Sequence, residues 1–396
     1  MKKHFLFLSA ALLLAGAASC SKNADSPLAP AEKADIPSGR ISVQVGIPDE
    51  EAKALANSSS VKDFQINSVQ VFVFDNAAMA GNGTEKLETD YYYSPSTPAT
   101  NSVSVTFNTA TDMKIIYVVV NKARMYRTRG SYTVADFEAE LTDLAENSLT
   151  GFVMVGRTDL LVTEFDKNKN PNQAAQAVNV WVKRQVAMVK LSAITVDFSH
   201  SSLAGANFTL TGMYLKNAVG RSRLGLNGNT DSAAAAASFL PLTQAQFSNG
   251  DFWYNKHTRT SGSPALLYDD ACNDACSTAN ESSSIGRCLF TYPNRTLPSA
   301  DSHSDAATWV PRLTRLTIKA HVSKNSNGVV LDQDTFYTFD LPAVEANKVY
   351  NIQNIRITQM GKDNDDKDTD LQGGQIAPTI SVAPWDSDVF NLNYEF

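Results

Sequence analysis

The sequence predicts an all-β fold with one short helix, arranged as two domains in tandem. Ile41, Val43 and Val45 alternate with polar residues or glycine, which is the period of a half-buried strand. Runs rich in β-branched and aromatic residues at 70–74 and 115–120 fit strands that are packed on both faces, as in the core of a β-sandwich. Because the chain has 396 residues, we expect two or three domains of ordinary size.

The first twenty residues predict export. Lys2 and Lys3 precede an almost wholly apolar stretch at 5–18, which is too short to span a bilayer comfortably and indicates a signal peptide. Residues 17–20 read Ala-Ala-Ser-Cys, which resembles the lipobox of bacterial lipoproteins. We therefore expect removal of residues 1–19 and acylation of Cys20. An ordinary secretory cleavage site is the alternative.

The rest of the chain divides at a polar loop. Residues 20–37 lack an apolar period and predict a tether. Residues 166–176 contain an Asn-Pro pair, a loop signal, and we place the boundary between an N-terminal β-sandwich domain at 38–178 and a C-terminal one at 179–396. Residues 225–310 are rich in Gly, Asn and Ser and predict loops. Further strands are expected at 178–182, 186–198, 313–322, 336–341 and 349–357.

One helix is predicted after Thr133. Thr133 and Asp136 have the spacing of a capping box. The helix is expected to cover the open side of a sheet. The apolar residues that fall on its one face are Val134, Phe137, Leu141 and Leu144.

The last segment, 379–396, is unusually apolar for a chain terminus, since termini are commonly polar and frayed. It forms two short amphipathic strands with a kink near Trp385, and its apolar side chains must be buried. Either a sheet of another chain or the chain's own last sheet could bury them. The side chains concerned are Ile380, Val382, Trp385, Phe390, Leu392, Tyr394 and Phe396.

Charge and motifs exclude several functions. The formal net charge is -7 and no basic cluster occurs, so nucleic-acid binding is not expected. No His-Glu-x-x-His, Gly-x-Ser-x-Gly or phosphate-binding loop occurs, so we expect neither an enzyme nor a cofactor. Two polar loops, 166–177 and 366–377, lack the glycine and glutamate of a calcium loop.

Three cysteines remain after Cys20, namely Cys272, Cys276 and Cys288. Because an exported protein can form disulfides, we expect one bridge and one spare thiol. A zinc site with His257 or His303 as the fourth ligand is the alternative, although the spacing matches no finger pattern. We expect no metal.

The order of several short segments carries a resemblance to a known family. After the lipobox come Ile-Ser-Val-Gln-Val at 41–45, the runs at 69–74 and 115–121, and Gly-Phe-Val-Met-Val-Gly at 151–156. Val-Lys-Arg-Gln-Val-Ala-Met-Val-Lys at 182–190 and Asn-Lys-Val-Tyr-Asn-Ile at 347–352 follow, and Ile-Ser-Val at 380–382 precedes Trp385. In this order the chain resembles the fimbrillins, the pilin family of Bacteroidia surface fimbriae.

The resemblance implies a fold and a mode of assembly. Family members have two transthyretin-like, Greek-key β-sandwich domains and are exported as outer-membrane lipoproteins. A trypsin-like protease cuts the loop after the first strand, that strand leaves, and the C-terminal strand of another subunit takes its place. Residues 379–396 would be the donor strand here. The apolar side chains of that segment would fill the side-chain pockets that the first strand leaves empty.

The processing loop departs from the family pattern. Between 46 and 63 the only basic residues are Lys53 and Lys62, and Arg40 lies before the first strand's apolar part. Either a protease cuts at a lysine, or Arg40 is used differently, or the subunit stays uncut and serves as an anchor.

The sequence therefore predicts a structural subunit of cell-surface fimbriae that polymerises by strand exchange and supports adhesion. Its expected partners are copies of itself, other fimbrial subunits and, through acylated Cys20, outer-membrane lipid. The alternatives are a monomeric surface lipoprotein that binds a glycan or a host protein through the 225–310 loops, an uncut fimbrial anchor, and an exported hydrolase.

Overall fold

The structure is a computed structural model of the chain. It describes residues 38–47, 65–76, 85–100, 102–166, 170, 172–199, 202–226, 253–254, 259, 261–294, 313–326, 329–365, 381–384 and 393–395. The chain divides into two units, 1–36 and 37–396, and every described residue belongs to the second. The predicted signal peptide, Cys20 and the tether lie outside the described residues.

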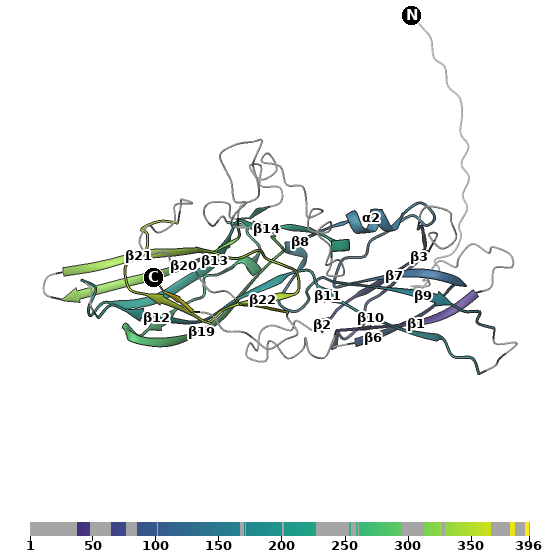
Figure 1. The fold of residues 1–396 in the computed structure, drawn as a ribbon, viewed down its shortest axis with the longest axis horizontal. Helices are drawn as coiled ribbons and strands as arrows, with labels where there is room; N and C mark the ends of the chain where they lie inside the picture. The colour runs from purple at the N-terminus through teal and green to yellow at the C-terminus, as the bar shows by residue number, and fades with distance from the viewer. Residues whose placement is uncertain are drawn as a thin grey trace, which may run out of the picture. The chain divides into compact units, whose positions relative to one another are not determined.

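Two sheets enclose the first hydrophobic core (Figure 1). One sheet has three strands in the order β10 (Gln176–Trp181), β1 (Ser38–Gly46) and β6 (Ser102–Ala110). The other has five strands, in the order β11 (Lys183–Arg184), β9 (Met154–Val162), β7 (Asp112–Val120), β3 (Val69–Asp75) and β4 (Leu87–Tyr93). The continuous apolar runs predicted as core strands are β3 and β7, which confirms that prediction.

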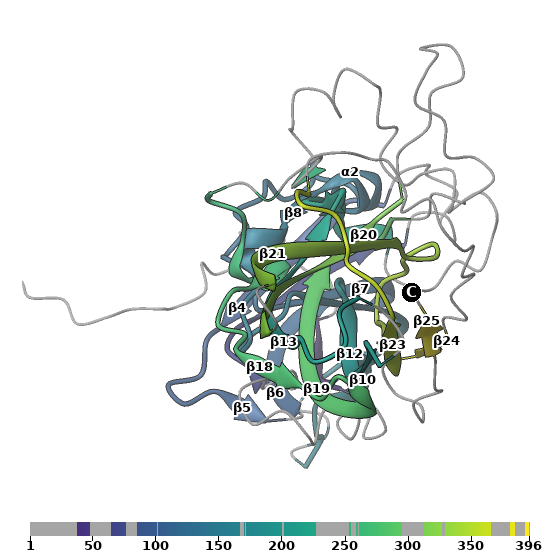
Figure 2. The same ribbon diagram turned by 90° about the vertical axis from the view of Figure 1, so that its left-hand side faces the viewer.

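A second pair of sheets encloses a larger core. Its first sheet contains β24 (Ser381–Pro384), β22 (Lys348–Ile352), β12 (Ala187–Asp197), β23 (Asn354–Ile357) and β25 (Asn393–Glu395), with β19 (Ala279–Thr291) paired to β12. Its second sheet contains β17 (Tyr268–Asp269), β13 (Asn207–Lys216), β20 (Arg315–Ser326) and β21 (Val329–Asp340), with β18 (Asp274–Cys276) paired to β13. Figure 2 turns the view by 90°, so that these strands, at the left in Figure 1, face the viewer.

Short elements connect the sheets. The two-stranded pairs are β2 (Gln65–Ile66) with β5 (Ala99–Thr100), β14 (Ala218–Val219) with β16 (Trp253–Tyr254), and β8 (Leu141–Asp143) with β15 (Arg221–Arg223). The 3₁₀ helices are η2 (Leu144–Glu146), η3 (Leu224–Leu226) and η4 (Ala265–Leu267). The prediction of an all-β fold with a minor helix and two β-sandwiches is confirmed, whereas the boundary at 178/179 stays a prediction.

The helix is α2 (Val134–Ala139), and its capping box forms as predicted. Phe137 packs against the five-stranded sheet, with its ring centroid 4.4 Å from that of Tyr117 and 5.3 Å from that of Phe72. The helix therefore covers a sheet face, as expected. The predicted extension to Leu144 is wrong, because residues 141–143 turn extended and pair with β15.

Two further predictions fail in the second pair of sheets. Residues 279–291, predicted as loop, form β19, whose first residues are mostly exposed and therefore lack an apolar period. The expected disulfide is absent, since Cys272, Cys276 and Cys288 are all free. Cys276 lies on a strand paired to β13 and Cys288 on a strand paired to β12, so the two thiols belong to different sheets.

Candidate functional site

The first strand, β1, lies between two partners. It pairs antiparallel with β6, where Ile41 faces Phe107 and Val45 faces Val103, and parallel with β10, where Val43 faces Val178. Its backbone is thus hydrogen-bonded along both edges. We call the position between β6 and β10 that residues 38–47 fill the β1 slot.

Side chains of β1 alternate strictly between the core and the outside. Ile41, Val43 and Val45 are completely buried, and Ile47 is 2% exposed. These four side chains belong to the first core, together with residues of β3, β7 and β9. The strand therefore completes the hydrophobic core as well as the sheet.

The outer face of β1 is polar. Ser42 makes side-chain hydrogen bonds with β6: its Oγ lies 3.1 Å from Ser104 Oγ and accepts a 3.0 Å bond from Thr106 Oγ1. Arg40 and Gln44 are exposed. The Arg40 guanidinium lies 5.6 Å from the centroid of the Phe165 ring.

The predicted processing residues are placed only in part. Lys53 and Lys62 lie outside the described residues. Arg40 lies within β1 and pairs with Asn108 of β6, so its backbone belongs to the sheet and not to a loop. A cut after Arg40 would leave Ile41, Val43 and Val45 joined to the following chain and the β1 slot filled.

A polar clamp, formed by Glu88, Lys114 and Asp75, holds the end of β6 without using β1. The Glu88 carboxylate accepts hydrogen bonds from the Ala110 N–H (2.6 Å) and from Thr109 Oγ1 (2.7 Å). Lys114 Nζ lies 2.6 Å from Glu88 Oε2 and 2.5 Å from Asp75 Oδ1. The clamp therefore ties β6 to β4, β7 and β3.

Burial and hydrogen bonding oppose each other in this clamp. Burial alone would raise the pKa of Glu88, but the bonds from Ala110 and Lys114 outweigh it and the pKa is lowered. Burial alone would lower the pKa of Lys114, whose side chain is 2% exposed, yet its bonds to Asp75 and Glu88 raise it. Both groups are therefore held in their charged forms.

The C-terminal segment is described at two short strands. β24 pairs antiparallel with β22, so that Val382 faces Tyr350, and β25 pairs parallel with β23, so that Tyr394 faces Ile355. Both strands extend the chain's own sheet (Figure 2). The other predicted donor residues, Ile380, Trp385, Phe390, Leu392 and Phe396, lie outside the described residues, and the donor role stays a prediction.

A hydrogen-bonded junction links the two pairs of sheets. Asn147 Nδ2 donates to the hydroxyl of Tyr292 (2.9 Å), and Asn147 Oδ1 accepts from the backbone N–H of Val153 (2.8 Å). The Tyr292 hydroxyl also donates to Asp143 O (3.1 Å) and lies 3.0 Å from Thr142 Oγ1. Tyr292 is completely buried in the second core, and this burial raises the pKa of its hydroxyl.

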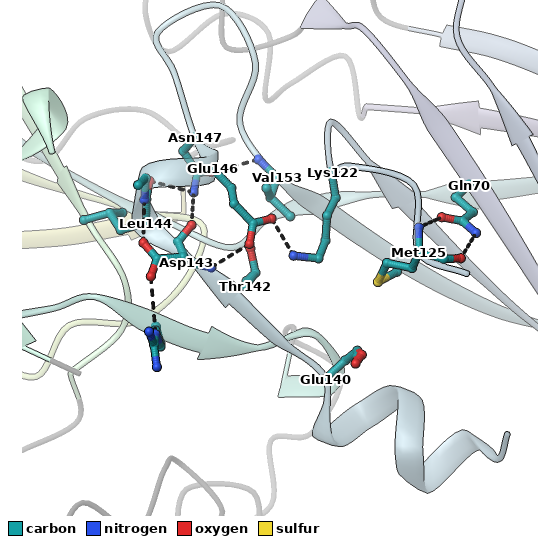
Figure 3. A network of polar contacts seen from close by, with 12 residues as sticks. Gln70, Lys122, Met125, Glu140, Thr142, Asp143, Leu144, Glu146, Asn147 and Val153 are labelled. Atoms are coloured by element: carbon teal, nitrogen blue, oxygen red, sulfur yellow. Dashed lines mark hydrogen bonds and ion pairs between the residues drawn. The ribbon is translucent and has the colours of Figure 1, made fainter. Parts of the chain in front are cut away.

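Two carboxylates fix the turn that carries Asn147 (Figure 3). Asp143 Oδ1 accepts from the Ala145 N–H (2.9 Å), and Glu146 Oε1 accepts from the Asp143 N–H (3.0 Å). Lys122 pairs with Glu146. This junction could not be predicted from the sequence, because its members are distant in the chain: Thr142 and Tyr292 are 150 residues apart.

Two described tyrosines of the middle segment, Tyr254 and Tyr268, have partners within the chain. The Tyr254 hydroxyl donates to Asp143 Oδ1 (3.3 Å), and the Arg259 guanidinium lies 3.8 Å from the Tyr268 ring centroid. His257 and His303 lie outside the described residues. Among the described residues, no group of three or more His, Cys, Asp or Glu side chains could hold a metal ion, and no helix is long and apolar enough to cross a membrane.

Solved structures of two candidate cell adhesion proteins and of a fimbrilin are similar to the chain. A candidate cell adhesion protein from Parabacteroides distasonis matches with a TM-score of 0.53 and 13% sequence identity, over 91% of this chain and 99% of that one. A candidate cell adhesion protein from Bacteroides eggerthii matches with a TM-score of 0.49 and 15% identity, over 91% and 99% of the two chains. A fimbrilin from Porphyromonas gingivalis matches with a TM-score of 0.49 and 13% identity, over 90% and 97%.

Sequence comparison gives no such match: no protein-family model and no curated protein matches the chain. At identities of this size a likeness is one of fold. The resemblance to fimbrillins read from the sequence is confirmed at that level, and none of the three matched structures is described as an enzyme. The chain shares its fold, over nearly its whole length, with the Parabacteroides distasonis adhesion candidate.

Proposed function

We propose that the chain is a structural subunit of cell-surface fimbriae that joins other subunits by strand exchange and supports adhesion. The observation that carries the proposal is the position of β1, which is hydrogen-bonded on both edges and contributes four buried side chains to the core. An extended segment of a second copy offers the same backbone groups and apolar side chains, which is how strand addition gives affinity and specificity.

The segment proposed as the donor is 379–396. Its large apolar side chains would each contribute about 1.5–3 kcal/mol on burial, so that six of them contribute on the order of 10 kcal/mol, an upper figure because the free segment is partly covered. We further propose export as a lipoprotein acylated at Cys20 and two sandwich domains that meet near 178. Processing falls at Lys53 or Lys62, between β1 and β2.

The test uses the chain from residue 21 onward, treated with a limiting trypsin-like protease. New N-termini are read by mass spectrometry and assembly by gel filtration and by denaturing gels without heating. The expected result is a cut after Lys53 or Lys62 followed by detergent-resistant ladders. The matched controls are deletion of 379–396, which should abolish the ladders and keep the cut, and the double variant Lys53→Gln/Lys62→Gln, which should abolish both.

One observation favours a second candidate, an uncut anchor or a monomeric binding lipoprotein. The backbones of β24 and β25 pair with the chain's own sheet, so a donor segment would have to leave β22 and β23 first. Cut chains that stay monomeric, or chains that resist the protease, would reject the exchange and support this candidate.

A further inference from the structure

We propose that both ends of the β1 slot are closed to side chains, so that a strand that spans the whole slot needs glycine at the position of Gly39 and a very small residue at that of Gly46. This inference rests on the proposed function and limits how the proposed donor can lie: residues 379–396 contain no glycine, so that segment can fill positions 40–47 but cannot extend past the position of Gly39. It concerns residues 39–47, where apolar side chains at 41, 43, 45 and 47 fill the core.

The first wall lies against Gly39. A Cβ on Gly39 would lie 2.1 Å from Val162 Cγ1 and 2.9 Å from the backbone oxygen of Thr163. Both distances are shorter than any stable contact between non-bonded heavy atoms of these types. Val162 is itself 2% exposed, and the Thr163 oxygen belongs to the backbone, which cannot give way as the end of a flexible side chain can.

A glutamine side chain fixes the first wall in place. Gln176 Oε1 accepts a hydrogen bond from the Thr163 N–H (3.1 Å), and Gln176 Nε2 donates to Leu161 O (2.8 Å). The backbone at 161–163 is thus held from both sides. Gln176 also pairs with Ile41 of β1, so the wall stands directly beside the strand that it limits.

The second wall is the indole of Trp181. Gly46 is buried, although Arg40 and Gln44 on the same face of β1 are exposed. A Cβ on Gly46 would lie 2.7 Å from Trp181 Cζ3 and 3.1 Å from Cε3. Trp181 is 57% exposed, so its ring covers the strand on one side and meets solvent on the other.

The backbone around Trp181 is fixed as well. The Val182 N–H donates to Gly46 O (3.0 Å), and a Cβ on Gly156 would lie 2.5 Å from Trp181 O. Only the indole can move, by leaving its place over Gly46. Such a movement uncovers the hydrogen bond between the Val182 N–H and Gly46 O.

Space, not backbone conformation, requires both glycines. Among the described residues the glycines with positive φ are Gly130, Gly205, Gly262 and Gly286, so neither Gly39 nor Gly46 needs the left-handed region. In an ordinary extended strand glycine weakens the sheet. Two glycines at the ends of a strand that otherwise alternates apolar and polar side chains are therefore explained by the walls.

The walls also decide a register. Placing Ile-Ser-Val of 380–382 on Ile-Ser-Val of 41–43 puts Pro378 at the first wall and Trp385 beneath Trp181. Both side chains are far larger than the space allows. An incoming strand with the direction of β1 cannot use this register, and the shared tripeptide is not the basis of a replacement.

The first experiment uses the uncut chain, so it does not depend on exchange. Gly46→Val is compared with Gln44→Val, which puts the same side chain on the same face of the same strand at an open position. The midpoint of urea unfolding should fall for Gly46→Val and stay near wild type for Gln44→Val. In a Trp181→Ala background the loss of stability caused by Gly46→Val should largely disappear, whereas the loss caused by Gly39→Ala should persist.

Two results would overturn the second wall: equal midpoints for Gly46→Val and Gln44→Val, or a loss of stability from Gly46→Val that is unchanged in Trp181→Ala. A Gly39→Ala midpoint near that of wild type would overturn the first wall.

The second experiment places the substitution in the incoming strand. The full chain, nicked between 47 and 65, is incubated with a fluorescent peptide of residues 38–47, and binding is followed by anisotropy. A Gly46→Val peptide should bind about tenfold or more weakly than a Gln44→Val peptide, which corresponds to about 1.4 kcal/mol, and Trp181→Ala in the chain should remove the difference. Equal affinities overturn the inference. If no peptide binds although the first experiment succeeds, the walls stand and the proposed exchange is rejected.

Discussion

At the scale of single residues, the clamp of Glu88, Lys114 and Asp75 shows why charged groups occur inside this fold. Lys114 lies near the start of β7, just before the apolar part of that strand, and pairs in register with Asp75 of β3. Its charge is compensated by two carboxylates, and a buried charge is tolerated only when it is paired and hydrogen-bonded. The result is a lysine that acts as part of the core.

Removing the lysine should destabilise the protein strongly. Lys114→Met leaves Glu88 buried without its cation, which costs about 3 kcal/mol or more, measured as a lower free energy of unfolding in urea. Lys319→Met is the control, because the Lys319–Asp334 pair is more than a third exposed on both sides and should contribute little. Equal losses for the two variants would show that the clamp is not buried in solution.

The same clamp predicts a pH dependence. The pKa of Glu88 is lowered from its ordinary value of 4.5, so its contribution to stability is complete above pH 4.5 and is lost as the pH falls through the lower folded-state pKa. Glu88→Gln should therefore flatten the loss of stability below pH 4.5. Urea unfolding between pH 3 and pH 7 measures this, and parallel curves for the two proteins would contradict it.

The cysteines illustrate how residue-level expectations can fail. Export favoured a disulfide, but burial raises the pKa of Cys272 to about 12 and those of Cys276 and Cys288 to about 11. Because the thiolate is the reactive form, these side chains are inert in the folded state. They pack as small apolar groups.

At the scale of elements, β1 was the strand that the sequence described best. Alternation at Ile41, Val43 and Val45 predicted both the strand and its buried face, since a half-buried strand must alternate. The glycines at its ends were visible but not interpretable, because Val162 and Trp181, which close on them, are more than a hundred residues away in sequence. Only the tertiary fold reveals such contacts.

The stability that β1 provides can be measured directly. Ile41→Ala removes a completely buried side chain and should lower the free energy of unfolding by about 2–5 kcal/mol. Val330→Ala, at a strand position that is 74% exposed, is the control and should change it by less than about 0.5 kcal/mol. A small effect at Ile41 would mean that β1 does not complete the core.

Other elements departed from prediction for identifiable reasons. The helix was expected to run to Leu144, but pairing of 141–143 with β15 satisfies backbone groups that a longer helix would also satisfy. Strand β19 was missed because its first half is polar, and hydrogen bonding to β12 alone defines it. In both cases a partner distant in sequence decided the outcome.

At the scale of the whole molecule, the sequence predicted the fold class and the order of strands better than the contacts between the two pairs of sheets. Core strands can be recognised from their amino-acid composition, whereas the junction depends on single hydrogen bonds. In the sequence, nothing distinguishes Tyr292, the centre of that junction, from the other aromatic residues. The clamp was hidden for the same reason, since it requires the register of three strands.

The junction should contribute to stability through one hydroxyl. Tyr292→Phe removes the 2.9 Å acceptor of Asn147 Nδ2, which keeps only the longer bonds to Leu144 O (3.3 Å) and Asp143 O (3.4 Å). The loss should cost about 1–3 kcal/mol, read from thermal or urea unfolding. Tyr254→Phe removes a half-buried hydroxyl with a single 3.3 Å bond and should have a smaller effect. A loss for Tyr254→Phe as large as that for Tyr292→Phe would argue against a special role of the junction.

The pairing of β1 has a mechanical consequence. A strand bonded along both edges, and pulled along its own axis, loads all of its ladder bonds at the same time, whereas a strand peeled from one end breaks them one after another. Any strand that lies in this place is therefore hardest to remove under tension parallel to the sheet. If the chain is a fimbrial subunit, as proposed above, that geometry makes the many weak hydrogen bonds of one strand resist shear together.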